Sequence, residues 1–400
     1  MQPSSVESKK IFTRPYCFLF IINLILSLTL YMTNPTLAQH LGGIGIGFAT
    51  AGTLIGVMSI SSMIFRPFSG WISDHFQRKK LLALSLALMG ISFVGYAVTN
   101  AAALFLIFRV LHGIAFGMTT TVTMAYVSEH IPPSRVGEGM GYFALGQSVA
   151  TAIGPFIGLS LLERFHSSLV FLMAGLLVGL CLVLVLCLPY SAAKNTEQGL
   201  PLRDSLNVKN FIAKEAALYA ILTIAISATN GIETSFLSGY AETISLKNIG
   251  WYFTVSACTL FLTRLFLGKL SDRIGFAKVF YPSMLCIAVS FFLLSQLKKE
   301  NAMMLLTAAS ILKAVGIGTI QPGIQAACIK SVPDYRRGSA SSTYYIGADL
   351  GQGGATAAAG GIIAVQGYSG MFLWFIIPLG IATITYFVTR FYQKKKGKTI

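Results

Sequence analysis

The chain has 400 residues, of which 54% are hydrophobic and only 11% are charged, and its mean hydropathy is +0.70. Because soluble domains carry about 25% charged residues, this composition excludes an ordinary soluble fold. The formal net charge of +16 suggests nucleic acid as a partner, so the positions of the basic residues decide that question.

Twelve apolar stretches follow one another along the chain, each long enough to cross about 30 Å of hydrocarbon as a helix. They cover residues 16–38, 46–71, 80–99, 102–128, 137–161, 168–189, 212–238, 248–271, 278–297, 302–329, 338–364 and 369–391. They contain Gly and Pro and lack the alternation of a transmembrane barrel. The sequence therefore predicts an all-α membrane protein with twelve transmembrane helices.

The basic residues are distributed unequally between the two sides of the membrane. The termini and the loops on their side hold 22 of the 30 Lys and Arg residues, and the opposite loops hold four. The positive-inside rule then predicts a multi-pass protein of the cell membrane with both termini in the cytoplasm. The excess charge reflects topology and contact with anionic lipid, so nucleic acid is not an expected partner.

The longest polar interruption, residues 190–211, is expected to be a cytoplasmic linker between an N-terminal half (1–189) and a C-terminal half (212–400). The halves are related by a repeat. Residues 137–146 (GEGMGYFALG) align with 338–347 (GSASSTYYIG) at an offset of 201. Two related membrane halves are typical of transporters, and they predict two pseudo-symmetric six-helix bundles.

An Arg, a Gly and an Asp recur at i, i+4 and i+8, on one stripe of a helix, near the cytoplasmic end of one stretch in each half. The two copies are Arg66-Gly70-Asp74 and Arg264-Gly268-Asp272. A carboxylate is stabilised by the N–H groups at a helix start, and the repeat predicts that Asp74 faces the start near Gly338 and Asp272 the start near Gly137.

Basic residues flank both copies. Arg78 and Lys79 follow the first copy and Arg273 follows the second, while Arg135, Arg336 and Arg337 precede the two helix starts and are expected to pair with the acids. Contacts that form in one conformation and break in the other bias an inward–outward equilibrium. We therefore interpret this set as a cytoplasmic gate, and the alternative is that these residues only terminate helices and set topology.

Four motifs resemble those of one family. They are Gly70–Lys79 (GWISDHFQRK), Gly268–Gly275 (GKLSDRIG), Arg109–Gly113 (RVLHG) and Gly146 with Gly154–Gly158 (GPFIG). Over essentially its whole length the chain resembles the major facilitator superfamily, and within it the twelve-helix drug/proton antiporter-like exporters. His75, Gln77, His112 and Leu159 depart from the family's usual residues. The resemblance implies a monomeric exporter driven by the proton gradient, without a cofactor, in which Arg109 takes part in proton coupling.

The fifth apolar stretch, residues 137–161, contains the small residues Gly146, Gly154 and Gly158 together with Pro155, and we call these four residues the helix 5 motif. Small side chains let membrane helices approach closely, and a proline loosens the helical hydrogen-bond ladder. Tight packing between the two halves is the expectation for this helix.

Charged residues inside a membrane are expensive and are usually functional. Arg109, Lys313 and Asp349 approach mid-depth, and Glu233 is expected at the outer interface. Asp349 is the expected proton site, and a static Asp349–Lys313 ion pair is the alternative. His112 is either a proton carrier or a helix-packing hydrogen-bond donor.

Two cations against one acid favour an anionic, zwitterionic or neutral amphiphilic substrate. The residues expected to line the substrate cavity, each of which is alternatively a packing or lipid-facing residue, are Tyr31, Asn34, Arg109, Phe116, Tyr142, Gln147, Asn230, Gln321, Tyr345 and Asp349.

Other classes of function are less well supported. The six cysteines lie in apolar stretches without CxxC spacing, so no metal site is expected. A membrane enzyme would need a nucleophile–base pair or an acid cluster, and neither a Gly-x-Ser-x-Gly elbow nor a DxxxD cluster occurs. A proton symporter or facilitator importing a small nutrient remains the alternative transporter.

Overall fold

The computed structural model describes residues 10–43, 48–188, 211–246, 249–267 and 270–395. These residues form helices and connecting turns, with no strand among them. The long helices of the first half are α1 (Arg14–Gly43), α2 (Phe48–His75), α3 (Arg78–Val98), α4 (Ala102–Glu129), α5 (Val136–Arg164) and α6 (Ser167–Leu186). The helices of the second half are α8 (Ala217–Thr243), α9 (Gly250–Leu267), α10 (Leu270–Ile274), α11 (Phe276–Ser295), α12 (Ala302–Lys330), α13 (Arg337–Trp374) and α14 (Ile376–Lys395). Single 3-10 turns precede α5, α8 and α13, namely η1 (Pro133–Arg135), η4 (Lys214–Ala216) and η5 (Asp334–Arg336).

Ten helical stretches of the described residues are long and apolar enough to cross a membrane. One of them, residues 334–392, holds both of the last two predicted spans, and the second predicted span corresponds to the 28-residue α2. The predicted break between the last two spans, residues 365–368, contains a kink in α13. Gly367 has φ +70°, a conformation that glycine adopts at little cost, and helix resumes after this kink before α14 begins.

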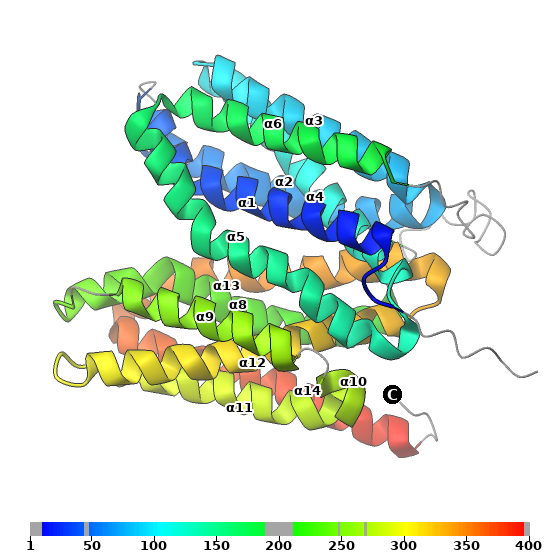
Figure 1. Cartoon of the computed structure of the whole chain (residues 1–400). Helices are drawn as coiled ribbons and strands as arrows, with labels where there is room; N and C mark the ends of the chain where they lie inside the picture. Colours follow the sequence, from blue (N-terminus) through cyan, green and yellow to red (C-terminus); the bar gives the residue numbers. More distant parts are fainter. Residues whose placement is uncertain (1–9, 44–47, 189–210, 247–248, 268–269, 396–400) are drawn as a thin grey trace, which may run out of the picture.

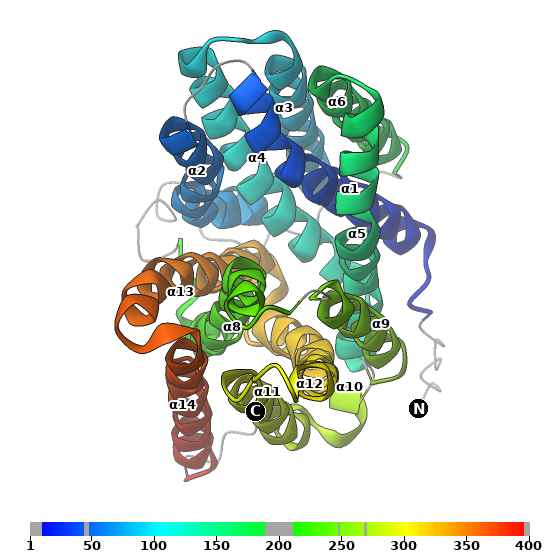
Figure 2. The ribbon, with the colours of Figure 1, turned by 90° about the vertical axis from the view of Figure 1, so that its left-hand side faces the viewer.

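Two helical bundles are plain in Figures 1 and 2, one built from α1–α6 and the other from α8–α14. Equivalent helices make equivalent contacts: α1 packs on α5 as α8 packs on α13, and α2 packs on α4 as α9 packs on α12. This repeated pattern is the one expected from the sequence repeat. The predicted linker at 190–211 lies outside the described residues, except for Phe211.

The bundles contact each other through α13 against α2 and α4, and through α5 against α9, α10 and α12. We call the side on which α1 begins and α14 ends the termini side (right in Figure 1). The helices α2 and α9 end on this same side, and α5 and α13 begin there. The two Asp-containing copies therefore meet the predicted helix starts on the termini side.

The expectation that the helix 5 glycines pack between the halves is wrong. A Cβ on Gly154 would lie 2.7 Å from the Cβ of Tyr31, and a Cβ on Gly158 would collide with the carbonyl oxygen of Met32. Both contacts are with α1, inside the first half. The small residues are needed here because α1 and α5 lie almost backbone to backbone, which packs these two helices of the first half tightly together.

Candidate functional site

The Arg66-Gly70-Asp74 stripe of α2 faces α13. Asp74 Oδ1 accepts a hydrogen bond from the N–H of Gly338 (2.6 Å), and Oδ2 accepts from the N–H (2.9 Å) and the hydroxyl (2.6 Å) of Ser339. A Cβ on Gly70 would lie 3.0 Å from the carbonyl oxygen of Gly338, so the approach of the two helices leaves no room for a side chain. The carboxylate therefore sits on the helix start that the repeat predicts.

The second copy makes a weaker version of this contact. Asp272 Oδ2 accepts a hydrogen bond from the N–H of Glu138 (2.8 Å), and a Cβ on Gly137 would lie 2.9 Å from the same oxygen. Lys330 approaches Asp272 Oδ1 at 3.3 Å, although its side chain is 45% exposed. Gly268, the middle residue of this copy, lies outside the described residues.

The expected pairing of the flanking arginines with these acids is wrong. They pair with other carboxylates, as Arg135–Glu138, Arg336–Glu215 and Arg337–Asp334. Glu138 and Asp334 lie only three residues from their arginines along the chain. The carboxylates of Asp74 and Asp272 already accept hydrogen bonds from backbone N–H groups. Arg78 Nη2 is the cation near Asp74, at 3.5 Å, and it also pairs with Glu129. Lys79 donates instead to the carbonyl oxygens of Leu186, the last residue of α6, and of Leu188, and Arg273 is exposed.

Arg66 joins the two halves through an ion pair. Its Nε donates to Asp349 Oδ2 (2.5 Å) and its Nη2 to Asp349 Oδ1 (3.1 Å), which is the bidentate geometry of a strong charge-assisted contact. Nη1 donates to Thr120 Oγ1 (2.9 Å), and the guanidinium lies 4.7 Å from the ring centroid of Tyr345. The Arg66 side chain is 2% exposed and that of Asp349 is 25% exposed. We call Arg66, Thr120 and Asp349 the first cluster.

Arg264 joins the halves on the other side of the interface. Its Nη1 donates to the carbonyl oxygen of Ala144 and to Ser148 Oγ, both on α5, and its Nη2 donates to Gln321 Oε1 (2.8 Å) on α12. The residue is 3% exposed. We call Arg264, Gln321 and Ser148 the second cluster.

The sequence repeat relates the two clusters. Thr120 and Gln321 are 201 positions apart, and Ser148 and Asp349 are separated by the same 201 positions. Each arginine thus donates a hydrogen bond to a polar side chain of its own half and another to a side chain of the other half. The repeat relates the two acceptor positions in the opposite halves. The acceptor position carries a carboxylate in the first cluster and a hydroxyl in the second.

The alternative Asp349–Lys313 pair is absent, and the interfacial placement of Glu233 is wrong. Lys313 pairs with Glu233 between α12 and α8, and both side chains are less than 10% exposed. The Lys313 Nζ also lies 5.8 Å from the ring centroid of Phe291. Glu233 lies deeper than expected because the described α8 continues to Thr243, almost three turns beyond it. Lys313 therefore adds no unpaired positive charge to the interface between the halves.

Arg109 and His112 lie inside the first half. Arg109 Nε donates to the carbonyl oxygen of Leu54 (3.0 Å), and its guanidinium lies 5.9 Å from the ring centroid of Tyr96. His112 Nδ1 is 3.0 Å from the Tyr96 hydroxyl. Arg109 and His112 are each 2% exposed, so the structure places both in helix packing between α2, α3 and α4.

The remaining cavity candidates are only partly brought together. Tyr345 and Asp349 belong with Arg66, and Gln321 belongs with Arg264. Tyr142 lies away from them, because its hydroxyl donates to Glu138 at the termini side. Asn34 and Gln147 are exposed, whereas the half-buried candidates are Tyr31, Phe116 and Asn230.

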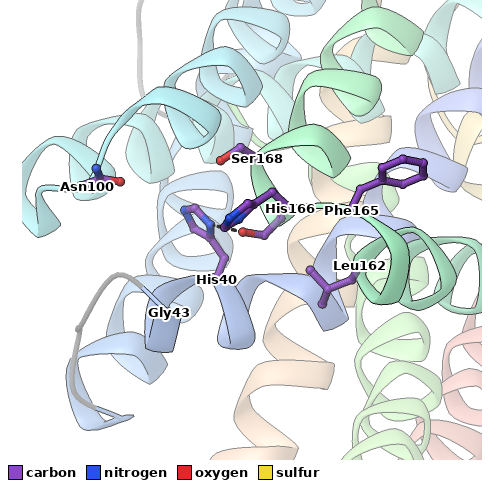
Figure 3. A pocket seen from close by; sticks show the side chains of 8 residues that line it. His40, Gly43, Asn100, Leu162, Phe165, His166 and Ser168 are labelled. Atoms are coloured by element: carbon purple, nitrogen blue, oxygen red, sulfur yellow. Dashed lines mark hydrogen bonds between the residues drawn. The ribbon is translucent and has the colours of Figure 1, made fainter.

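A separate pocket opens at the end of the first half remote from the termini. Figure 3 shows it between the end of α1, the α3–α4 turn and the α5–α6 turn, with His40 hydrogen-bonded to Ser167 (2.7 Å). None of the predicted site residues lines this pocket.

Comparison with known proteins identifies the family. The model of the Major Facilitator Superfamily matches residues 19–243 and again 218–399. The chain belongs to the major facilitator superfamily. It is therefore a membrane transporter and not an enzyme, as the motifs indicated.

Two bacterial relatives of this superfamily member are named for drug resistance, and one of them is named as an efflux pump. The quinolone resistance protein NorA of Staphylococcus aureus (strain MRSA252) is 26% identical over 247 residues, which are 60% of this chain and 62% of NorA. The multi-drug resistance efflux pump PmrA of Streptococcus pneumoniae serotype 4 is 22% identical over 336 residues, 78% of this chain and 79% of PmrA. The NorA alignment thus spans less than two thirds of that relative.

Solved structures of the superfamily share the fold. The human organic anion transporter MFSD10 (TETRAN) superposes with a TM-score of 0.78 at 17% identity, covering 93% of this chain and 98% of that one. The transporter FucP in its outward conformation gives 0.75 at 16% identity, covering 94% and 98%.

Sequence reasoning missed the partners that define the two clusters. The sequence pattern places Arg66 in the gate and does not by itself point to Thr120 or Ser148. The signal that points to them is the 201-residue offset, because extending it by two positions beyond Gly347 pairs Asp349 with Ser148.

Proposed function

We propose that this superfamily member is a proton-coupled exporter, which moves a small amphiphilic compound out of the cell by alternating access. Its termini side faces the cytoplasm, in line with the excess of Lys and Arg in the loops on that side. Export is supported by the helix 5 motif, by the efflux activity stated in the name of PmrA and by the quinolone resistance stated in the name of NorA.

The observation that carries the proposal is the bidentate Arg66–Asp349 pair between the halves. Together with Asp74 on the start of α13 and Asp272 on the start of α5, it joins the bundles towards the termini side. We infer that the structure represents the state closed on that side. Asp349 keeps a quarter of its side chain exposed, which leaves it accessible to a proton.

Protonation of Asp349 couples the proton to the conformational change. A neutral carboxyl no longer attracts the guanidinium, so the termini side loses its ionic contact between the halves and opens. The proton then leaves towards the cytoplasm and the transported compound enters. Closure of the termini side restores the ion pair and exposes the bound compound to the outside. One cycle thus exchanges one inward proton for one outward compound.

Inside-out membrane vesicles with an acidic interior test this function. We expect accumulation of fluorescent cationic, neutral or anionic amphiphiles that depends on the pH gradient and is lost in Asp349→Asn. Asp334→Asn is the matched control, since Asp334 is an acid with an 85% exposed side chain on the turn before α13. Accumulation that persists undiminished in Asp349→Asn refutes the coupling site. Accumulation only under the reversed gradient indicates a symporter.

A further inference from the structure

Arg264 is a buried cation whose partners are all neutral. The partners in the structure are the carbonyl oxygen of Ala144, the Ser148 hydroxyl and the Gln321 side chain. No carboxylate lies within ion-pair distance of Arg264 in the described part of the chain, and its Nε–H finds no acceptor there. A buried charge without an opposite charge is costly and is usually retained for function.

The equivalent arginine in the first half shows which partner is missing. Arg66 also donates to a polar side chain of its own half, and it then finds the carboxylate of Asp349 in the other half. At the position related to Asp349 by the 201-residue offset, the chain carries Ser148. Arg66 therefore has a carboxylate partner in the structure, whereas Arg264 has a hydroxyl at the equivalent position.

We propose that an anionic group of the transported compound, most simply a carboxylate, binds Arg264 in the way that Asp349 binds Arg66. This names a substrate class for the proposed export function and rests on it. A planar guanidinium favours this ligand because its N–H groups match the two oxygens of a carboxylate.

The contacts of Arg264 also set when the anion binds. Ala144 and Ser148 belong to the first half, so they withdraw from Arg264 when the halves separate on the termini side. Gln321 stays, because α12 and α9 belong to the same half. The freed N–H groups then take the carboxylate of the compound. Closure brings the carbonyl of Ala144 and the Ser148 hydroxyl back to Nη1, and they displace the anion towards the opposite side.

Two other intramembrane cations already have carboxylates in the structure. Arg66 pairs with Asp349, and Lys313 pairs with Glu233. Arg109 lies within the first half, where it donates to the carbonyl of Leu54 rather than facing the second half. The positive site that the sequence predicts for an anionic compound is therefore at the interface, on Arg264.

Equilibrium binding to the purified protein in lipid nanodiscs tests this inference, with empty nanodiscs as the partition control. The probes are three pairs matched in their apolar part: 2-naphthoate with 2-naphthamide, indole-3-acetate with indole-3-acetamide, and octanoate with octanamide. We expect the carboxylate of at least one pair to bind more tightly than its amide at neutral pH. In Ser148→Asp the new carboxylate occupies Arg264, so the carboxylate-to-amide affinity ratio of that pair falls about tenfold or more.

Thr151→Asp is the matched control, because it adds the same charge to an exposed position one turn further along α5. We expect it to keep the affinity ratio of the wild type. If Ser148→Asp does not fold, Arg264→Gln tests the same contact, and it should lower the carboxylate-to-amide affinity ratio to a similar extent.

Two results overturn the inference: no carboxylate binds more tightly than its amide, or the preference survives in both Ser148→Asp and Arg264→Gln. Binding needs no proton gradient, so this failure is distinct from a failure of coupling, which appears as gradient-independent uptake in vesicles.

Discussion

Replacing Asp349 by Asn should open the termini side of the transporter. The change keeps the size of the side chain but removes the charge that Arg66 contacts at 2.5 and 3.1 Å. Hydrogen bonds to charged groups contribute about 1.5–3 kcal/mol each, and Asn retains one acceptor. Since the Asp349 side chain is 25% exposed, we expect a net loss of about 2–3 kcal/mol, which is a shift of about 30- to 150-fold towards the open state.

Distances between spin labels at Lys80→Cys on α3 and Arg273→Cys on α10 measure this shift, because both positions are exposed and lie in different halves. The six native cysteines are replaced first. We expect a longer mean distance in Asp349→Asn at every pH, and the same lengthening in the unsubstituted transporter only on acidification. An unchanged distance, or an Asp349→Asn variant that still responds to pH like its parent, refutes the argument.

Two further predictions concern the gate and the packing of α1 against α5. With the same labels, Asp74→Asn should lengthen the distance more than Asp272→Asn, because Asp74 accepts three hydrogen bonds at the start of α13 and Asp272 only one from α5. Equal effects would contradict this ranking. In detergent, Gly158→Ala should lower stability by about 1–3 kcal/mol, because its Cβ meets the backbone of Met32. Gly179→Ala, whose Cβ meets nothing within 4 Å, should leave the unfolding temperature unchanged or slightly higher.

The architecture could be predicted from the sequence because the bilayer restricts what a chain can form. Long apolar stretches become helices, and the repeat of Arg66-Gly70-Asp74 in the second half indicates two related bundles. The contact of Asp74 with the start of α13 could also be predicted from the sequence. A carboxylate at one helix end, the start of another helix and the repeat offset are sufficient to place it.

The partners of the buried charges could not be predicted in the same way. Depth along a helix can be read from residue number, but the direction in which a side chain points depends on helix rotation and tilt. Lys313 and Asp349 lie at similar depths, yet Lys313 points to Glu233 inside the second half and Asp349 points across the interface to Arg66. A charge count that ignores direction therefore placed the positive site at the wrong residues.

The repeat is most informative where its two copies differ. A perfectly symmetric interface would hold two identical ion pairs, and protonation would then have to break both before the termini side opened. In this chain the first cluster contains the carboxylate of Asp349, whereas the equivalent position in the second cluster is Ser148, which has a hydroxyl. In the proposed mechanism the first cluster responds to protons, whereas the guanidinium of the second cluster has no carboxylate partner in the described part of the chain and binds the anion of the compound. The difference between Asp349 and Ser148 thus separates the proposed proton site from the proposed substrate site, at two positions of one interface that the repeat relates.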